Sequence, residues 1–143
     1  MNGERGDAGG AGSTEGTADI EIRRVHDAEV RDGSGLRGRR VFLVDGMWPR
    51  GVRKADLPLD GWPKGLAPSR ELRTWFGHDP DRWDGFRERY RAELDALGAD
   101  ALAPLLDAAR EGPVTLLYAA RDTEHNNAAA LREHLLDRLH GPR

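Results

Sequence analysis

Three short apolar runs stand out from the polar chain, and each has the length and composition of a β-strand. Residues 20–25 alternate partly between β-branched and charged side chains, and residues 40–44 form a nearly continuous apolar run. Residues 114–118 are apolar and follow a Gly-Pro pair, so they give the clearest strand pattern. Residues 57–62 could add a short edge strand.

The remaining apolar positions recur at helical spacing. Ser69 is suited to cap a helix over residues 69–76, and Gly77 ends it. Asp79-Pro80 opens a second helix, which runs to Gly98 with its apolar stripe at Trp83, Phe86, Tyr90, Leu94 and Leu97. Two more helices are expected over residues 102–110 and about 124–139. Glycines predict a loop over residues 26–40, and prolines exclude a long helix from residues 45–68.

Strands separated by helical stretches predict an α/β fold with a small, mainly parallel sheet of three to four strands. Helices flanking both faces would give a Rossmann-like arrangement in three layers. The 143 residues suffice for one domain, which we place at residues 19–140. Residues 1–18 are rich in glycine and polar side chains, so we expect a disordered tail.

Composition narrows the function classes. No cysteine occurs, which excludes disulfides, thiol catalysis and cysteine-ligated metals. No secretory signal or membrane-spanning run is visible, so we expect a cytoplasmic protein that does not enter the membrane. The net charge is −3, but residues 36–91 carry 13 basic against 8 acidic side chains. A basic middle section favours anionic ligands, although its arginines could equally be solvent-exposed helix positions.

Polar side chains gather immediately after two of the predicted strands. If residues 41–44 and 114–118 are parallel neighbours, the segment 45–54 faces the segment 119–127 at the carboxyl edge of the sheet, where α/β proteins bind ligands. Asp45 and His125 are then the candidate catalytic groups, as acid or base. Asp45 could instead satisfy loop N–H groups, and His125 could be an ordinary surface histidine.

The same two segments supply candidate anion-binding groups. Arg50 could clamp a phosphate or carboxylate bidentately, or pin its own loop. The other candidates at this edge are Trp48, Arg53, Tyr118, Arg121 and Asn126. Trp48 could also be a hydrophobic anchor, Asp122 is a possible site residue or a helix cap, and His78 contributes only if its turn folds over the strand ends.

Metal and nucleotide motifs are missing from the sequence. The five histidines follow no metal-ligand spacing, so we expect no metal site. Neither a Gly-x-Gly-x-x-Gly pattern nor a P-loop occurs, and no cofactor or oligomeric state can be assigned from the sequence.

Several motifs in a fixed order resemble the YeaO-like bacterial family of unknown function. They are Asp45–Gly51, Leu66–Ser69, Trp75–Pro80, Leu117–Asp122 and His125-Asn126. The resemblance spans about residues 20–139 and implies a small α/β domain, without implying an activity. The family pattern has arginine where this chain has Gly46, so a cationic group is replaced here. Arg53, Lys54 or the arginines at 37, 39 and 40 could compensate.

The leading hypothesis is therefore a small protein that binds an anionic small molecule, such as a phosphorylated one, at the carboxyl ends of its strands, as a binder or an enzyme. A nucleic-acid-binding or regulatory protein is one alternative, because the 69–76 and 79–97 helices superficially resemble a helix-turn-helix. The aromatic stripe and the acidic whole chain make nucleic acid the less favoured partner. A non-catalytic interaction domain is the other alternative.

Overall fold

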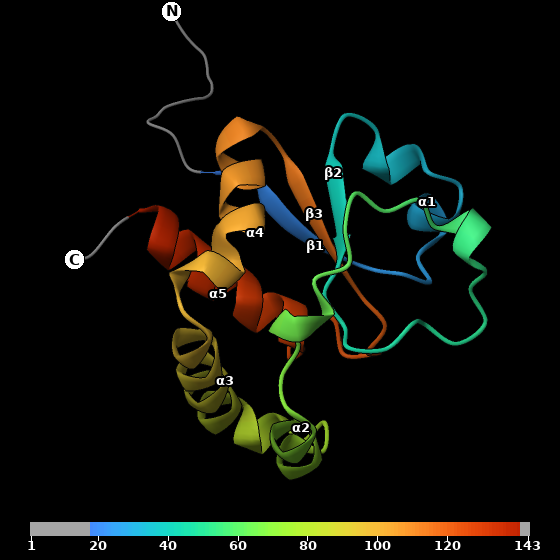
Figure 1. Cartoon of the computed structure of the whole chain (residues 1–143). Coiled ribbons are helices and arrows are strands. Elements are labelled where there is room, and N and C mark those ends of the chain that lie inside the picture. Colours follow the sequence, from blue (N-terminus) through green and yellow to red (C-terminus); the bar gives the residue numbers. More distant parts are fainter. Residues whose placement is uncertain (1–17, 141–143) are drawn as a thin grey trace, which may run out of the picture.

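A sheet of three parallel strands forms the centre of the computed structural model, which describes residues 18–140 (Figure 1). The strands are β1 (Ile20–Arg24), β2 (Arg40–Leu43) and β3 (Val114–Tyr118), in the order β1-β3-β2. All five residues of β3 are buried because it lies between the other two strands. The parallel β2–β3 pair places the segments after residues 44 and 118 at the same edge, as the sequence predicts.

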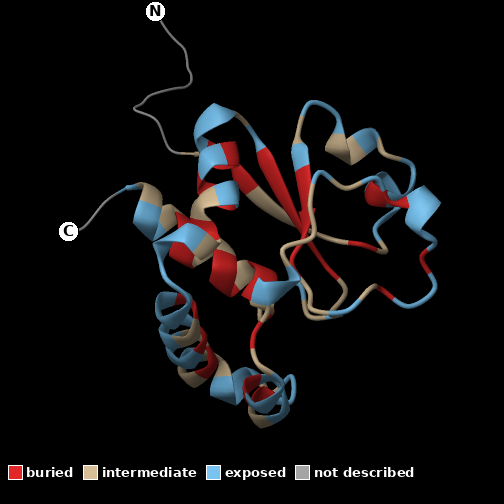
Figure 2. Cartoon of the chain, viewed as in Figure 1, coloured by how far each residue is buried: buried red, intermediate tan, exposed pale blue. Residues whose placement is uncertain are grey.

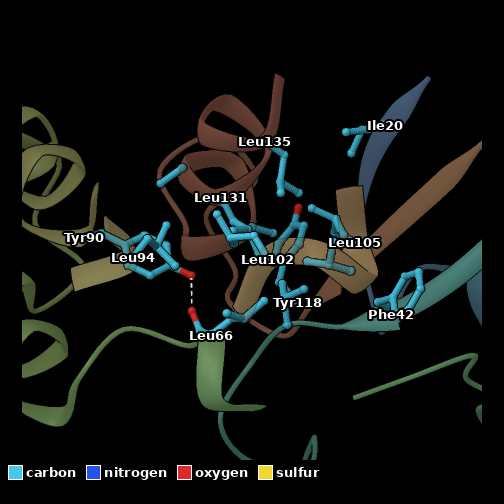
Figure 3. Close-up of a cluster of buried hydrophobic side chains, with 14 of the residues drawn as sticks. Ile20, Phe42, Leu66, Tyr90, Leu94, Leu102, Leu105, Tyr118, Leu131 and Leu135 are labelled. Carbon is cyan, nitrogen blue, oxygen red and sulfur yellow. Dashed lines mark hydrogen bonds between the residues drawn. The ribbon is translucent and has the colours of Figure 1, made fainter. Parts of the chain in front are cut away.

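Helices α4 (Ala99–Glu111) and α5 (Asn127–Leu139) cover one face of the sheet (Figure 1). Alternate strand residues, including Phe42, Leu116 and Tyr118, meet the leucines of these helices in the larger hydrophobic core (Figure 3). Each helix buries one stripe and exposes the other (Figure 2). Burial of this apolar surface is the main favourable term for the fold.

Helices α2 (Arg70–Phe76) and α3 (Trp83–Leu97) extend this core beyond the end of the sheet (Figure 1). The buried Tyr90 hydroxyl of α3 donates to the Leu66 carbonyl at 2.5 Å (Figure 3), which ties α3 to the segment before α2. Ser69 caps α2 as predicted, through its hydroxyl and the Leu72 N–H. Left-handed Gly77 ends the helix.

The opposite face of the sheet is covered mainly by irregular chain. The short helix α1 (Ala28–Arg31) and the segment 45–62 bury a second cluster of hydrophobic side chains. Its buried members are Val25, Val30, Val41, Leu43, Val52, Leu57 and Leu117. Residues 26–40 were predicted to be a loop, but they contain α1 and a 3₁₀ turn at Ser34–Leu36. Val30 is buried in the second cluster and holds α1 against the sheet.

Element boundaries differ from the sequence predictions at several places. The helix predicted to open at Asp79-Pro80 begins with a 3₁₀ turn, Pro80–Arg82, and α3 starts at Trp83. The segment 57–62 forms only one bridge, Phe42 to Gly61, because Pro58 has no N–H with which to continue a ladder. Helix α4 begins at Ala99 rather than residue 102, since Gly98, at φ +90°, allows a sharp turn directly out of α3. Helix α5 begins at Asn127 rather than near residue 124, because Asn126 is its cap.

The predicted α/β class with a small parallel sheet and flanking helices is confirmed. None of the helices within residues 18–140 combines the length and the apolar composition needed to span a membrane. The predicted disordered tail lies, except for residue 18, outside the described residues.

Candidate functional site

A cavity of about 420 Å³ opens at the carboxyl ends of β2 and β3. Its walls come from the segment 45–50, the segment after β3, and α2 with the turn that follows it. Asp45, Arg50, His78 and His125 all line it, so residues far apart in the sequence meet where the strand order predicts. Phe76 and Phe86 give the cavity an apolar side.

Asp45 is tied into the structure through both carboxylate oxygens. Oδ2 accepts from the Ala119 N–H at 2.9 Å, and Oδ1 accepts from Asn127 Nδ2 at 3.1 Å. Burial raises the Asp45 pKa, while these two hydrogen bonds and the charge of Arg73 act in the opposite direction. Asp45 therefore joins the β2 and β3 junctions and also contributes an acidic group to the cavity wall.

Two tryptophans hold the segment after β2 in place. Trp48 Nε1 donates to the Val52 carbonyl at 2.6 Å, and Trp62 Nε1 donates to the Asp45 carbonyl at 2.8 Å. Their rings meet edge to face, with centroids 5.5 Å apart. Trp48 lines the cavity, but its packing against the second hydrophobic cluster gives it the anchoring role that the sequence left open.

Arg50 and Arg73 bring two guanidinium groups to the cavity wall. Both residues are exposed, and within residues 18–140 neither makes an ion pair or a side-chain hydrogen bond. Other arginines of the described chain, such as Arg39, Arg87 and Arg91, form ion pairs with carboxylates. Guanidinium groups without an internal partner are available to an anion.

His125 is oriented by a neighbouring carboxylate. Its Nδ1 lies 3.0 Å from Asp122 Oδ2, and its ring packs edge-on against Trp83 with centroids 5.3 Å apart. Asp122 also accepts the N–H groups of His125 and Glu124, which lowers the Asp122 pKa. A charged Asp122 favours the tautomer with the proton on Nδ1 and leaves Nε2 available.

His78 has an unusual backbone conformation. Its φ of +58° makes it the sole non-glycine residue with positive φ in the described chain. The turn Gly77-His78 directs the chain back along the cavity, and His78 lines it. The structure thus meets the condition under which the sequence analysis made His78 a site residue.

Asn126 and Asn127 have different roles although they are neighbours. Asn126 is buried and caps α5, since its Oδ1 accepts from the Ala129 N–H at 2.9 Å. Its amide group donates to the Asp122 carbonyl, so both ends of the side chain are used inside the fold. Asn127, which was not among the predicted site residues, reaches Asp45 and the Val44 carbonyl.

Four predicted site residues do not line the cavity. Arg53 is exposed and paired with Asp56 at 3.0 Å, and Arg121 is exposed. Tyr118 is only 2% exposed, because the alternation of β3 turns its side chain onto the sheet face covered by α4 and α5 (Figure 3). Asp122 contacts His125 instead.

Arg73 is the most informative residue that the sequence analysis missed. It lies three positions before Phe76 on α2, so the two residues share a helix face. The sequence analysis predicted this helix but did not name Arg73 as a candidate. Only the docking of α2 over the strand ends, which depends on long-range packing, brings this face to the cavity.

Metal-binding groups are not concentrated at the site. Within the part of the chain that the structure describes, no three His, Cys, Asp or Glu side chains gather closely enough to hold a metal ion.

Gly46 also lines the cavity, and a Cβ atom built there would lie 3.3 Å from the Ala67 Cβ. A side chain at this position would therefore need only a small shift of Ala67.

Comparison with known proteins places relatives of this chain in several bacteria. The profile of a family described as "Inactive DUF488-N3 subclade" matches residues 19–143. The chain is 43% identical to the uncharacterized protein YeaO of Escherichia coli over 81% of this chain and 96% of YeaO. It is also 43% identical to uncharacterized proteins of Mycobacterium tuberculosis and Mycobacterium bovis, over 80% of this chain and 91% of each relative. No solved structure matches it.

Proposed function

Because the chain belongs to the family described as the inactive DUF488-N3 subclade, we propose that it binds an anionic small molecule without transforming it. The proposed site is the cavity at the carboxyl ends of β2 and β3. The observation that carries the proposal is the pair Arg50 and Arg73, which line this cavity without an ion pair inside the described chain.

The chemistry of the remaining wall supports an anion as the ligand. His78 adds an imidazole group that can donate a hydrogen bond, and Asn127 belongs to the first turn of α5. The start of a helix favours negative charge, which adds to the effect of the arginines. A phosphate or carboxylate attached to an apolar body fits a cavity that also has Phe76 and Phe86 in its wall.

The position of Asp45 supports binding over catalysis. Its two oxygens already accept hydrogen bonds from Ala119 and Asn127, which hold the two strand–loop junctions together. A general base needs an oxygen within hydrogen-bond reach of the proton that it removes. The word "inactive" in the family description agrees with this interpretation.

A thermal-shift screen tests the proposal directly. Phosphate, phenyl phosphate and benzoate should raise the melting temperature of the protein, with a dependence on ligand concentration that gives a dissociation constant. Arg50→Ala and Arg73→Ala should each weaken this stabilisation roughly tenfold in apparent affinity. Arg110→Ala, on the exposed side of α4, removes the same charge elsewhere and is the matched control. Equal effects of all three substitutions, or no stabilisation by any anion, would refute the proposal.

Acid–base catalysis by Asp45 and His125 is the second candidate function. It is favoured by the contact between His125 Nδ1 and Asp122, which holds the imidazole in the manner of a general base. Hydrolysis of p-nitrophenyl phosphate provides a test. Turnover by the wild-type protein that is lost in both Asp45→Asn and His125→Gln would support catalysis. A wild-type rate equal to that of buffer alone leaves binding as the function of the site.

A further inference from the structure

A second hollow, of about 510 Å³, opens beside the cavity. It is lined by Met47, Arg70, Arg73 and Thr74. Met47 and Arg73 also line the cavity, so the two spaces are adjacent and share part of a wall. A ligand long enough to pass Arg73 would contact both.

The second hollow has the composition of an anion site. Arg70 and Arg73 lie three positions apart on α2, and like charges at this spacing repel each other. Neither guanidinium forms an ion pair within residues 18–140, although the charge of Arg73 also acts on Asp45. Thr74 adds a hydroxyl group that can donate to a phosphate oxygen.

We infer that the ligand carries two phosphate-like groups, one held in the cavity by Arg50 and Arg73 and the other in the hollow by Arg70, Arg73 and Thr74. This inference rests on the proposed function, because it extends the same site along α2. Arg73 lies between the two groups and neutralises charge from both. The apolar side of the cavity and exposed Met47 contact the uncharged part of the molecule.

The geometry of the arginines also explains why a single phosphate would be an incomplete ligand. Arg50 follows β2, whereas Arg70 belongs to the first turn of α2, so they lie on separate elements at the two ends of the site. A single phosphate in the cavity leaves Arg70 without a partner. A second anionic group at the hollow gains charge-assisted hydrogen bonds there.

Calorimetric titration with alkane diphosphonates of increasing chain length tests this inference, with alkyl monophosphonates of the same lengths as the reference. At least one diphosphonate should bind roughly tenfold more tightly than its monophosphonate partner. Arg70→Ala should abolish that gain. Arg70→Lys should keep part of it, and Arg110→Ala should keep all of it.

The outcomes separate this inference from the proposed function. If monophosphonates bind through Arg50 but no diphosphonate binds more tightly, or if the gain survives Arg70→Ala, the two-anion ligand is refuted and the proposed function stands. If neither class of phosphonate binds, both are refuted. Circular dichroism should show that the exposed Arg70 variants keep the overall helix content of the protein.

Discussion

At the scale of single residues, His78 combines an unfavourable backbone with a place on the cavity wall. Positive φ costs a non-glycine residue about 1 kcal/mol, because its Cβ crowds the carbonyl oxygen. The φ of His78 is +58°, and Phe76 packs near its ring with centroids 6.3 Å apart. Strain of this kind is concentrated at functional sites, where a side chain is kept for its contacts with a ligand.

Replacing His78 with glycine should therefore separate stability from binding. We expect His78→Gly to raise the free energy of unfolding by about 1 kcal/mol, measured by urea denaturation, and to weaken anion binding. His78→Asn, which tolerates the same φ, should lose affinity with little change in stability. A less stable glycine variant would contradict the strain at this position. Unchanged affinity would show that His78 serves only the turn.

At Gly46 a side chain can be added to the cavity wall rather than removed from it. The resemblance to the YeaO-like family implies an arginine here, and the space near Ala67 requires only a slight adjustment. Gly46→Arg should increase the affinity for phosphate roughly tenfold, because it adds a guanidinium to the cavity wall. Gly46→Gln, of similar reach but uncharged, is the control, and equal affinities for the two variants would argue against an electrostatic role at this position.

Residue types were predictable at this scale, but their partners were not. Asp45, Arg50 and His125 could be named because polar side chains follow apolar runs. The sequence could not show that Asn127 rather than Asn126 reaches Asp45. The side chain of Asn126 caps α5, and this leaves Asn127 to donate to Asp45. Tyr118 was assigned to the rim, whereas strand alternation buries it.

At the scale of elements, α2 determines the shape of the site. It carries Arg73 and Phe76 to the cavity and Arg70 to the adjoining hollow. Its start is fixed by Ser69, whose N–H and hydroxyl both donate to the Glu93 carboxylate of α3, at 2.8 and 2.5 Å. The same hydroxyl accepts from the Leu72 N–H at 3.1 Å.

Ser69→Ala should consequently affect both stability and binding. Loss of the helix cap and of one partner of Glu93 should lower the free energy of unfolding by about 2 kcal/mol. Anion affinity should also fall, since α2 would no longer be held against α3. Ser69→Thr keeps the hydroxyl and should behave like the wild type in chemical denaturation and in titration. An alanine variant with normal affinity would show that α2 is positioned by its apolar face alone.

Helical spacing and caps predicted α2, α3 and the end of each helix well, because those signals are local. The layer formed by α1 and the segment 45–62 could not be derived in the same way. Its conformation depends on contacts such as the Trp62 indole with the Asp45 carbonyl and the Gly61 backbone beside Phe42. Such contacts join positions distant in the sequence and have no periodic pattern.

At the scale of the whole molecule, the α3–α5 interface pairs arginines of the basic middle section with carboxylates of α5. Arg87 pairs with Glu133 at 2.9 Å and Arg91 with Asp137 at 3.0 Å, while Arg89 lies over the Trp75 ring at 3.8 Å. These arginines lie on α3, the second helix of the pair that resembles a helix-turn-helix. Their intramolecular partners reduce the charge that α3 offers to a phosphate backbone, and the nucleic-acid hypothesis stays untested.

His134 lies in the same interface and should make stability depend on pH. It is 5% exposed, neither ring nitrogen has a hydrogen-bond partner in the described chain, and burial lowers its pKa below 6.5. Asp95 and Arg91 from α3 and Asp137 and Arg138 from α5 surround it. The unfolded chain therefore binds a proton on this histidine at a higher pH than the folded chain.

The free energy of unfolding should fall as the pH decreases through about 6.5, by at most about 1.4 kcal/mol per pH unit from this group. Above that pH the contribution of neutral His134 is fully present. His134→Leu should flatten this part of the profile in urea denaturation at a series of pH values, whereas His140→Leu, at an exposed position, should not. An unchanged pH profile in His134→Leu would assign the acid sensitivity to other groups.

The most direct test of the central claim is an NMR titration of the ¹⁵N-labelled protein with phenyl phosphate. We predict saturable amide shifts at residues 45–50, 73–78 and 119–127, the segments that enclose the cavity, and their loss in an Arg50→Ala, Arg73→Ala double variant. Shifts spread over arginines elsewhere on the surface, or shifts that persist in the double variant, would contradict an anion site at the carboxyl ends of β2 and β3.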